Sequence, residues 1–294
     1  MFYSPLRYPG GKNKLSSFIA KICELNGING HYVEPYAGGA SVALFLLIEG
    51  FVKEITINDK DRSIYALWYS VLNHTDELCQ KIESTEITLE NWYIQKGIQK
   101  NKHEVDLLDL GFSTLYMNRC NRSGIINGGM IGGIGQTGNY KINCRFNKSA
   151  IIGRIRKIAT YKDRIHLYND DALDLIDRIE KTSDKNTVFY FDPPYYLKAN
   201  SLYMNHYHDE NHRQVAKRIQ EIKNIQWIVS YDNVPFIQEI YTDCNKKEYS
   251  FKHTAYKSRV GQEILFFSNG LQNPEIVDWN PLNFKLVKSN IIYR

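Results

Sequence analysis

The sequence lacks the features of secreted, metal-binding and membrane-spanning chains. Its five cysteines are scattered, without a close pair at metal-ligand spacing, and an odd, dispersed set is typical of reduced thiols in a cytosolic protein. The N-terminus has no basic region followed by an apolar stretch, so we expect no secretory signal. The most apolar run, residues 40–48, is far too short to cross a bilayer. We therefore expect a soluble, cytoplasmic protein without a metal site.

The composition is that of an ordinary globular chain with a mild excess of positive charge. Its 294 residues, 43% of them hydrophobic, suffice for one large domain or a domain with a sizeable insertion. The formal net charge of +5 fits a polyanionic partner without requiring one. Tyrosine occurs 21 times, and unstacked bases stack on aromatic faces.

Two blocks of the sequence alternate between strands and helices. In the first block we expect strands at residues 32–34 and 54–57, with helices at 40–49 and 62–72. In the second block we expect strands at 165–168, 187–191, 227–231 and 263–267, and helices at 172–179, 212–222 and 235–241. Together the blocks predict an α/β fold with a Rossmann-like, doubly wound, mostly parallel sheet.

The middle of the chain does not alternate in this way. It is helical in pattern to about residue 118 and then becomes a glycine-rich loop with basic residues. We interpret residues 73–153 as an inserted, mainly helical domain, and residues 1–72 and 154–294 as the sheet domain. There is no internal repeat and no low-complexity tail.

A glycine turn after the first strand indicates a nucleoside site. The turn, Glu34-Pro35-Tyr36-Ala37-Gly38-Gly39, differs from the dinucleotide fingerprint G-x-G-x-x-G. Asp59 ends the next strand, where an acid hydrogen-bonds a ribose hydroxyl; the alternative is a helix cap. With the turn beside it, we favour ribose binding. Residues 133–138 match the fingerprint literally, but they follow no strand and open no helix, so we interpret them as a flexible loop.

The strongest local signal is Asp192-Pro193-Pro194-Tyr195, directly after an apolar strand. Two prolines cannot extend a central strand, so the chain must turn at the carboxyl edge of the sheet, where ligands bind in such folds. The carboxylate of Asp192 and the carbonyl of Pro193 can accept the two hydrogens of an adenine amino group, and Tyr195 can stack on the base. Such chemistry needs positioning and polarisation, without a covalent enzyme intermediate. The alternative is an ordinary turn with an aromatic anchor.

These motifs, in this order and over nearly the whole chain, resemble the Dam-like family of adenine-specific DNA methyltransferases. Arg7-Tyr8-Pro9-Gly10-Gly11-Lys12 is similar to the N-terminal motif of that family, and Asp192-Pro193-Pro194-Tyr195 matches its catalytic motif. The resemblance implies a class I methyltransferase fold. It also implies that S-adenosylmethionine is bound by Tyr8, Gly11, Lys12, Glu34, Pro35, Tyr36, Gly38, Gly39, Asp59, Asp171 and Asp192, with Asp170 as a rival of Asp171.

Some positions depart from the best-known members of that family. Tyr8 stands where they often carry tryptophan, which a stacking role tolerates. Residues 118–124 begin with the Asn-Arg pair of the family and then run into a glycine-rich stretch, so the recognition sequence cannot be carried over. Residues 198–208 follow the catalytic turn, and we expect them to form a flap over the base, with Tyr203 or Tyr207 as packing.

The insertion has residues suited to contact with duplex DNA. A base inside a duplex cannot reach a buried methyl donor, so such enzymes flip it out. Arginine pairs with guanine and asparagine with adenine in the major groove. The expected DNA-binding residues, each of which has solvation or internal pairing as its alternative, are Asn118, Arg119, Asn121, Arg122, Lys141 and Arg145.

The leading hypothesis is a site-specific methyltransferase acting on adenine N6 of a flipped-out base in double-stranded DNA, with a cognate restriction endonuclease or a phage as its setting. Rivals among enzymes are cytosine-N4 and RNA-adenine methylation, followed by glutamine methylation, which favours Asn at the position of Asp192. Rivals from other classes are a DNA-binding protein without catalysis and a nicotinamide-dependent oxidoreductase, which binding of NAD would reveal. The sequence leaves the recognition site and the oligomeric state open.

Overall fold

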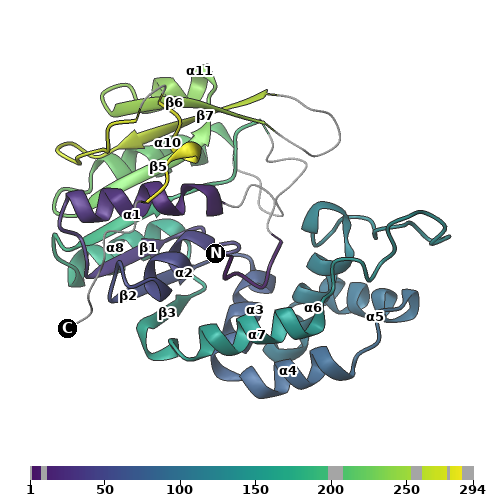
Figure 1. Cartoon of the computed structure of the whole chain (residues 1–294). Coiled ribbons are helices and arrows are strands. Elements are labelled where there is room, and N and C mark those ends of the chain that lie inside the picture. Colours follow the sequence, from purple (N-terminus) through teal and green to yellow (C-terminus); the bar gives the residue numbers. More distant parts are fainter. Residues whose placement is uncertain (1, 8–11, 198–207, 253–259, 277–278, 287–294) are drawn as a thin grey trace.

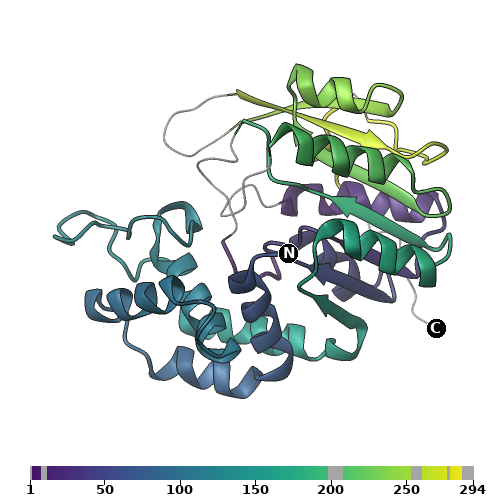
Figure 2. The ribbon, with the colours of Figure 1, turned by 180° about the vertical axis from the view of Figure 1, so that it is seen from behind.

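A sheet part and a helical part lie side by side in the computed structural model (Figures 1 and 2). The structure describes residues 2–7, 12–197, 208–252, 260–276 and 279–286. Among these residues, no helix is long and apolar enough to cross a membrane.

The described residues form one seven-stranded sheet in the order β3-β2-β1-β4-β5-β7-β6. Strands β1 to β5 are mutually parallel, and β7 runs antiparallel between β5 and β6. The strand order reverses between β1 and β4, which is the switch point where such sheets bind ligands. The strands are β1 (His31–Glu34), β2 (Glu54–Asn58), β3 (Ile165–Tyr168), β4 (Thr187–Phe191), β5 (Gln226–Asp232), β6 (Asn245–Lys252) and β7 (Val260–Phe267).

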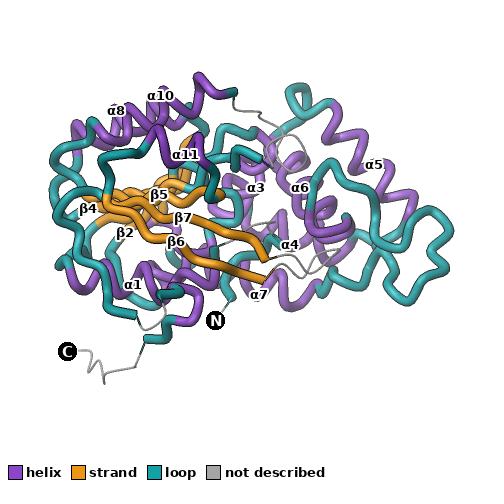
Figure 3. Tube along the Cα trace, turned by 90° about the horizontal axis from the view of Figure 1, so that it is seen from above, coloured by secondary structure: helices purple, strands orange, loops and turns teal. Residues whose placement is uncertain are grey.

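Helices cover both faces of the sheet, as the view from above shows (Figure 3). Along β4, Val188 and Tyr190 belong to one core, while Phe189 and Phe191 belong to the other. A strand buried on both faces reads as a continuous apolar run, which is why β4 stands out in the sequence. The first core includes α1 (Ser16–Leu25), α2 (Ser41–Ile48) and α3 (Arg62–Asn73); the second includes α8 (Ala172–Thr182), α10 (Asp209–Gln220) and α11 (Pro235–Ile240).

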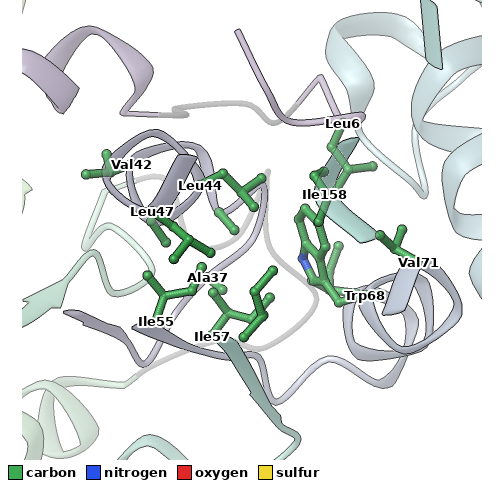
Figure 4. Packing of buried hydrophobic residues seen from close by; sticks show 14 of the residues in the cluster. Leu6, Ala37, Val42, Leu44, Leu47, Ile55, Ile57, Trp68, Val71 and Ile158 are labelled. Atoms are coloured by element: carbon green, nitrogen blue, oxygen red, sulfur yellow. The ribbon is translucent and has the colours of Figure 1, made fainter. Parts of the chain in front are cut away.

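The helical part is joined to the sheet part by a shared core. Its helices are α4 (Thr75–Ser84), α5 (Leu89–Lys100), α6 (Leu107–Cys120) and α7 (Lys148–Ala159). The indole of Trp68 in α3 packs near Leu6 and Ile158, and Ile57 of β2 lies on the side of the indole that faces the sheet (Figure 4). Helix α7 runs through residue 153, so the expected boundary falls inside a helix, and the division into two domains stays a prediction.

Most elements expected from the sequence are present within a few residues of their expected bounds. The glycine-rich residues 133–138 form turns, with no strand directly before them and no helix directly after, which confirms the loop interpretation. Helix α1 and strand β6 were not predicted from the sequence. The sequence of β6, Asn245–Lys252, is largely polar, and it forms an edge strand through its pairing with β7.

Candidate active site

The carboxyl edge of the sheet collects the polar residues that end its strands. Glu34 is the last residue of β1, Asp59 follows β2, Asp192 follows β4 and Asp232 ends β5. Because β7 is antiparallel, its beginning lies at this same edge, where Glu263 is paired with Asp232. Strand topology alone therefore brings these five carboxylates to one side of the sheet.

Asp192 is held through one of its two oxygens. Its Oδ1 accepts a hydrogen bond of 2.7 Å from Ser230 Oγ and lies 3.3 Å from Lys12 Nζ. Among the described residues, these are its recorded side-chain partners, so Oδ2 has none. Burial raises the pKa of Asp192, as does the nearby charge of Glu263, while the Lys12 ammonium opposes the shift.

A second carboxylate holds the turn that follows. Asp232 accepts backbone hydrogen bonds from Tyr196 N–H at 3.0 Å and from Leu197 N–H at 2.8 Å. Tyr195 is 4% exposed, and its hydroxyl donates to Glu263 Oε1 at 2.5 Å. The turn after the two prolines is thus fixed through both its backbone and its aromatic side chain.

Lys12 connects the N-terminal motif to the catalytic turn. Its ammonium lies 3.2 Å from Glu263 Oε1, donates to the Tyr195 hydroxyl and lies 4.6 Å from the Tyr195 ring centroid. Glu263 also accepts from the Tyr249 hydroxyl. Burial alone would raise the pKa of Glu263, but the Lys12 charge and the two tyrosine hydroxyls bring it below its usual value.

Sequence reasoning assigned no role to Ser230, Tyr249 or Glu263. Each is a polar residue within a β-strand, near the edge of the sheet that carries Asp192. Glu263 lies beside the apolar run Ile264-Leu265-Phe266-Phe267, and an acid in such a place was a usable signal.

Glu34 closes the first turn of α2 from the end of β1. Its Oε1 accepts hydrogen bonds from the Tyr32 hydroxyl at 3.0 Å and from Ala43 N–H at 3.1 Å. Burial raises its pKa to about 8, against the effect of these two donors. Glu34 is therefore an acid without a cation recorded beside it among the described residues.

The glycine turn brings backbone against Asp59. Gly38 and Ala40 both have φ of +45°, a region that is costly for alanine and typical of sites where the chain must turn tightly. Asp59 accepts from Gly38 N–H at 3.0 Å and from Asp61 N–H at 2.9 Å. Burial and the neighbouring Asp61 carboxylate raise the pKa of Asp59 to about 7. Asp61 is the residue that caps α3, so the alternative of a helix cap at Asp59 is wrong.

The two neighbouring acids after β3 have different partners. Asp171 caps α8 by accepting from Leu173 N–H at 3.0 Å, and it pairs with Lys60 at 2.7 Å. Asp170 pairs with Arg178 at 3.0 Å. The assignment of Asp171 to the cofactor adenine stays a prediction. Tyr8, Gly11 and the expected flap residues Tyr203 and Tyr207 lie outside the described residues.

Two of the expected DNA-binding residues hold the N-terminal segment, and their contact with DNA stays a prediction. The Asn118 amide accepts from Arg7 N–H at 2.8 Å and donates to the carbonyls of Arg7 and Gly124. Arg119 is 8% exposed and donates to the Pro5 carbonyl, and burial lowers its pKa to about 10. Helix α6 thus anchors the segment that leads into Lys12.

The remaining expected DNA-binding residues divide into buried and exposed ones. Asn121 is fully buried, accepts from Trp92 Nε1 at 2.7 Å and donates to two backbone carbonyls. Arg122, Lys141 and Arg145 are exposed on the glycine-rich loop. Of the six expected DNA-binding residues, these three have exposed side chains and the other three are buried.

The residues at the sheet edge fit a cationic nucleoside ligand. Glu34 is buried, and Asp59 and Asp192 are partly buried; burial raises the pKa of all three, and a bound positive charge would favour their ionised forms. The tight turn at Gly38 allows backbone to approach a ligand closely. Together with the sheet order, these features define a class I S-adenosylmethionine-dependent methyltransferase.

Comparison with known proteins identifies the family. The sequence model of the D12 class N6 adenine-specific DNA methyltransferases matches residues 8–258, and the chain belongs to this family. A curated relative, the type II methyltransferase M.MjaIII of Methanocaldococcus jannaschii, is 22% identical over 272 residues, which cover 83% of this chain and 89% of the relative. The chain is an N6-adenine DNA methyltransferase.

Similar solved structures have low sequence identity. A SAM-dependent methyltransferase from Agrobacterium tumefaciens is 9% identical with a TM-score of 0.39, over 86% of this chain and 60% of that one. The rRNA methyltransferase aviRa from Streptomyces viridochromogenes is 8% identical with a TM-score of 0.34, over 85% of this chain and 83% of that one.

Proposed function

We propose that Asp192 and the Pro193 carbonyl hold the amino group of an adenine that has been flipped out of duplex DNA. The observation that carries this proposal is the one-sided bonding of Asp192: Ser230 and Lys12 both engage Oδ1, which leaves Oδ2 for the substrate. The Pro193 carbonyl would accept the second amino hydrogen, and Tyr195 would stack on the base.

The two acceptors would make the adenine amino nitrogen a better nucleophile. The lone pair of an exocyclic adenine nitrogen is delocalised into the ring, and two acceptors on its hydrogens draw the nitrogen toward tetrahedral geometry. When bound, S-adenosylmethionine supplies an electrophilic methyl group on a sulfonium centre. The carbon–sulfur bond of that group would break as the carbon–nitrogen bond forms, and Asp192 Oδ2 would accept the proton that the methylated nitrogen releases. The raised pKa of the partly buried Asp192 carboxyl makes it a better base than an exposed aspartate.

The acids of the first two strands would bind the cofactor. Asp59 would accept from the ribose hydroxyls, and Glu34 would lie at the methionine end with Lys12. Both proposals rest on position at the carboxyl edge of the sheet and on the burial that raises the pKa of each acid. Pro35, Tyr36, Gly38 and Gly39 would line the nucleoside between them.

The glycine-rich loop of the insertion would contact DNA. Arg122, Lys141 and Arg145 are exposed there, and so are two large apolar side chains, Ile134 at 72% and Tyr140 at 65%. Cations beside exposed apolar groups suit phosphate contact combined with insertion at an opened base step. The type II designation of the curated relative supports a cognate restriction endonuclease as the partner of this enzyme.

The proposed roles are tested by labelled methyl transfer. Wild type and Asp192→Asn are incubated with labelled S-adenosylmethionine and mixed-sequence duplex DNA, and the nucleosides are then separated. We expect N6-methyladenine with wild type and a loss of about 100-fold or more with the variant, whose binding of S-adenosylhomocysteine is retained. Label in N4-methylcytosine, label in RNA alone, or an active variant would contradict the proposed substrate or the proposed role of Asp192.

A further inference from the structure

Glu263 lies at the centre of the bonds that fix the catalytic turn. It is 5% exposed, and its carboxylate contacts groups from three distant parts of the chain. Lys12 comes from the N-terminal motif, Tyr195 from the turn after β4, and Tyr249 from the neighbouring strand β6. A buried carboxylate is costly unless it is paired and hydrogen-bonded, and this set of donors meets that cost.

We propose that Glu263 is a positioning residue for methyl transfer, which shares the Lys12 ammonium with Asp192 and fixes the Tyr195 hydroxyl. This inference rests on the proposed function, because it concerns the same Asp192 carboxylate. The proposed role is exerted through Lys12 and Tyr195, which Glu263 contacts directly.

The position of Lys12 between two acids is the first argument. Its ammonium lies 3.2 Å from Glu263 and 3.3 Å from Asp192, so neither carboxylate holds the charge alone. Without the Glu263 charge, Asp192 would be the one carboxylate beside the Lys12 ammonium at Oδ1, and the stronger pairing would lower the basicity of the whole Asp192 carboxylate, Oδ2 included. The shared arrangement keeps Asp192 anchored and still basic.

The second argument concerns Tyr195. The proposed stacking role needs a ring in one orientation, and the turn that carries Tyr195 is fixed through backbone only from the next residue onward. The bond from the Tyr195 hydroxyl to Glu263 acts together with the Lys12 ammonium, which contacts the same hydroxyl and ring, to fix the orientation of the ring. Tyr249, paired across the strands with Glu263, donates to the other carboxylate oxygen and so holds the acid in place.

The test replaces Glu263 by the neutral glutamine. We expect Glu263→Gln to lower kcat about 10- to 100-fold, the range for misplaced reacting groups. We also expect the acid limb of the pH profile of kcat/KM for DNA to move to lower pH, because the Glu263 charge contributes to raising the pKa of Asp192. The matched control is Glu248→Gln, an exposed acid of the same hairpin, which should leave both quantities unchanged.

A second variant keeps the inference testable if Glu263→Gln folds poorly. Tyr249→Phe removes one donor to Glu263 without removing a charge, and we expect kcat to fall about 3- to 10-fold with the acid limb unmoved. Its control, Tyr241→Phe, removes a buried hydroxyl that has no hydrogen-bond partner among the described residues, and activity should be retained.

The two variants and the wild type separate the outcomes. Lower kcat in Glu263→Gln together with the downward shift of the acid limb supports the inference. Wild-type kcat in both variants overturns it, and so does lower activity in Glu263→Gln with an unmoved acid limb, which would indicate a structural role alone. A wild-type enzyme that forms no N6-methyladenine would overturn the proposed function itself.

Discussion

At the scale of single residues, the site is distinguished by acids with different charge environments. Glu34, Asp59 and Asp192 have pKa values raised by burial, whereas Glu263 has a lowered pKa because Lys12 and two hydroxyls outweigh its burial. Acids of the first kind favour a bound cation, and the acid of the second kind is already satisfied by the protein. Groups with divergent pKa values in one site are typical of a division of roles.

The stability of the ligand-free protein should depend on pH through Glu34. Burial raises the pKa of its carboxyl from the ordinary value of 4.5, which holds in the unfolded chain, to about 8 in the folded protein. Between these values the folded state binds more protons, so the free energy of unfolding decreases as pH rises, by at most about 1.4 kcal/mol per pH unit from this group. Glu34→Gln removes this contribution.

We therefore expect the Tm of Glu34→Gln, relative to wild type, to increase from pH 5 to pH 9 in thermal unfolding experiments. Glu86→Gln serves as the control, because it removes a carboxylate that is exposed. Its Tm should differ from that of wild type by the same amount at every pH. Parallel curves for wild type and Glu34→Gln would show that the Glu34 carboxyl is not perturbed.

At the scale of elements, the contact between α3 and α6 depends on a glycine. A Cβ on Gly111 of α6 would lie 2.4 Å from Ser70 Oγ and 2.5 Å from the Ala66 carbonyl oxygen, both on α3. Since the second of these is backbone, the helices would have to separate. We expect Gly111→Ala to lower the free energy of unfolding by about 1–3 kcal/mol.

Gly97→Ala is the matched control for Gly111→Ala. Gly97 lies inside α5, and a Cβ there would meet nothing within 4 Å. The substitution should be neutral or stabilising by about 0.5–1 kcal/mol, since alanine is the better helix former. Urea denaturation measures both variants, and equal effects would show that α3 and α6 are not in close contact.

Helix α6 should also act on the cofactor site through the N-terminal segment. Asn118→Ala removes the partners of Arg7 N–H and of the Arg7 and Gly124 carbonyls, and we expect a loss of about 1–3 kcal/mol in unfolding free energy. Affinity for S-adenosylhomocysteine should fall as well, because residues 4–7 lead into Lys12. Calorimetric titration checks this, with exposed Asn127→Ala as control. Normal stability with weaker DNA binding would instead support base contact by Asn118.

Local signals allowed the strands, the glycine turn and the catalytic turn to be predicted. The Asp192 motif follows an apolar strand directly, so proximity to the sheet edge followed from adjacent residues. The bond between Lys12 and Glu263 spans 251 positions, and no local pattern indicates it. Asn118 and Asn121 show the other limit: an amide that can bind a base can equally bind backbone, and only burial decides between the two.

At the scale of the whole molecule, charge is divided between two regions. The chain has a formal charge of +5, yet the sheet edge gathers buried and partly buried acids, while Arg122, Lys141 and Arg145 are exposed on the insertion. An acidic edge repels phosphates and admits an uncharged base, so the division favours a backbone held by the insertion and a base delivered to the sheet.

This division of charge predicts that the exposed cations of the loop determine how DNA affinity depends on salt concentration. Each phosphate contact contributes about 0.9 to the slope of log K against log salt concentration, so Arg122→Ala, Lys141→Ala and Arg145→Ala should each reduce the slope by about one. Fluorescence anisotropy with a labelled duplex measures the slope. The control is Lys217→Ala, which removes an exposed cation of α10 on the sheet part. It should leave the slope unchanged. If the loop variants kept the wild-type slope, DNA would have to be held by other cations, and the insertion would lose its proposed role.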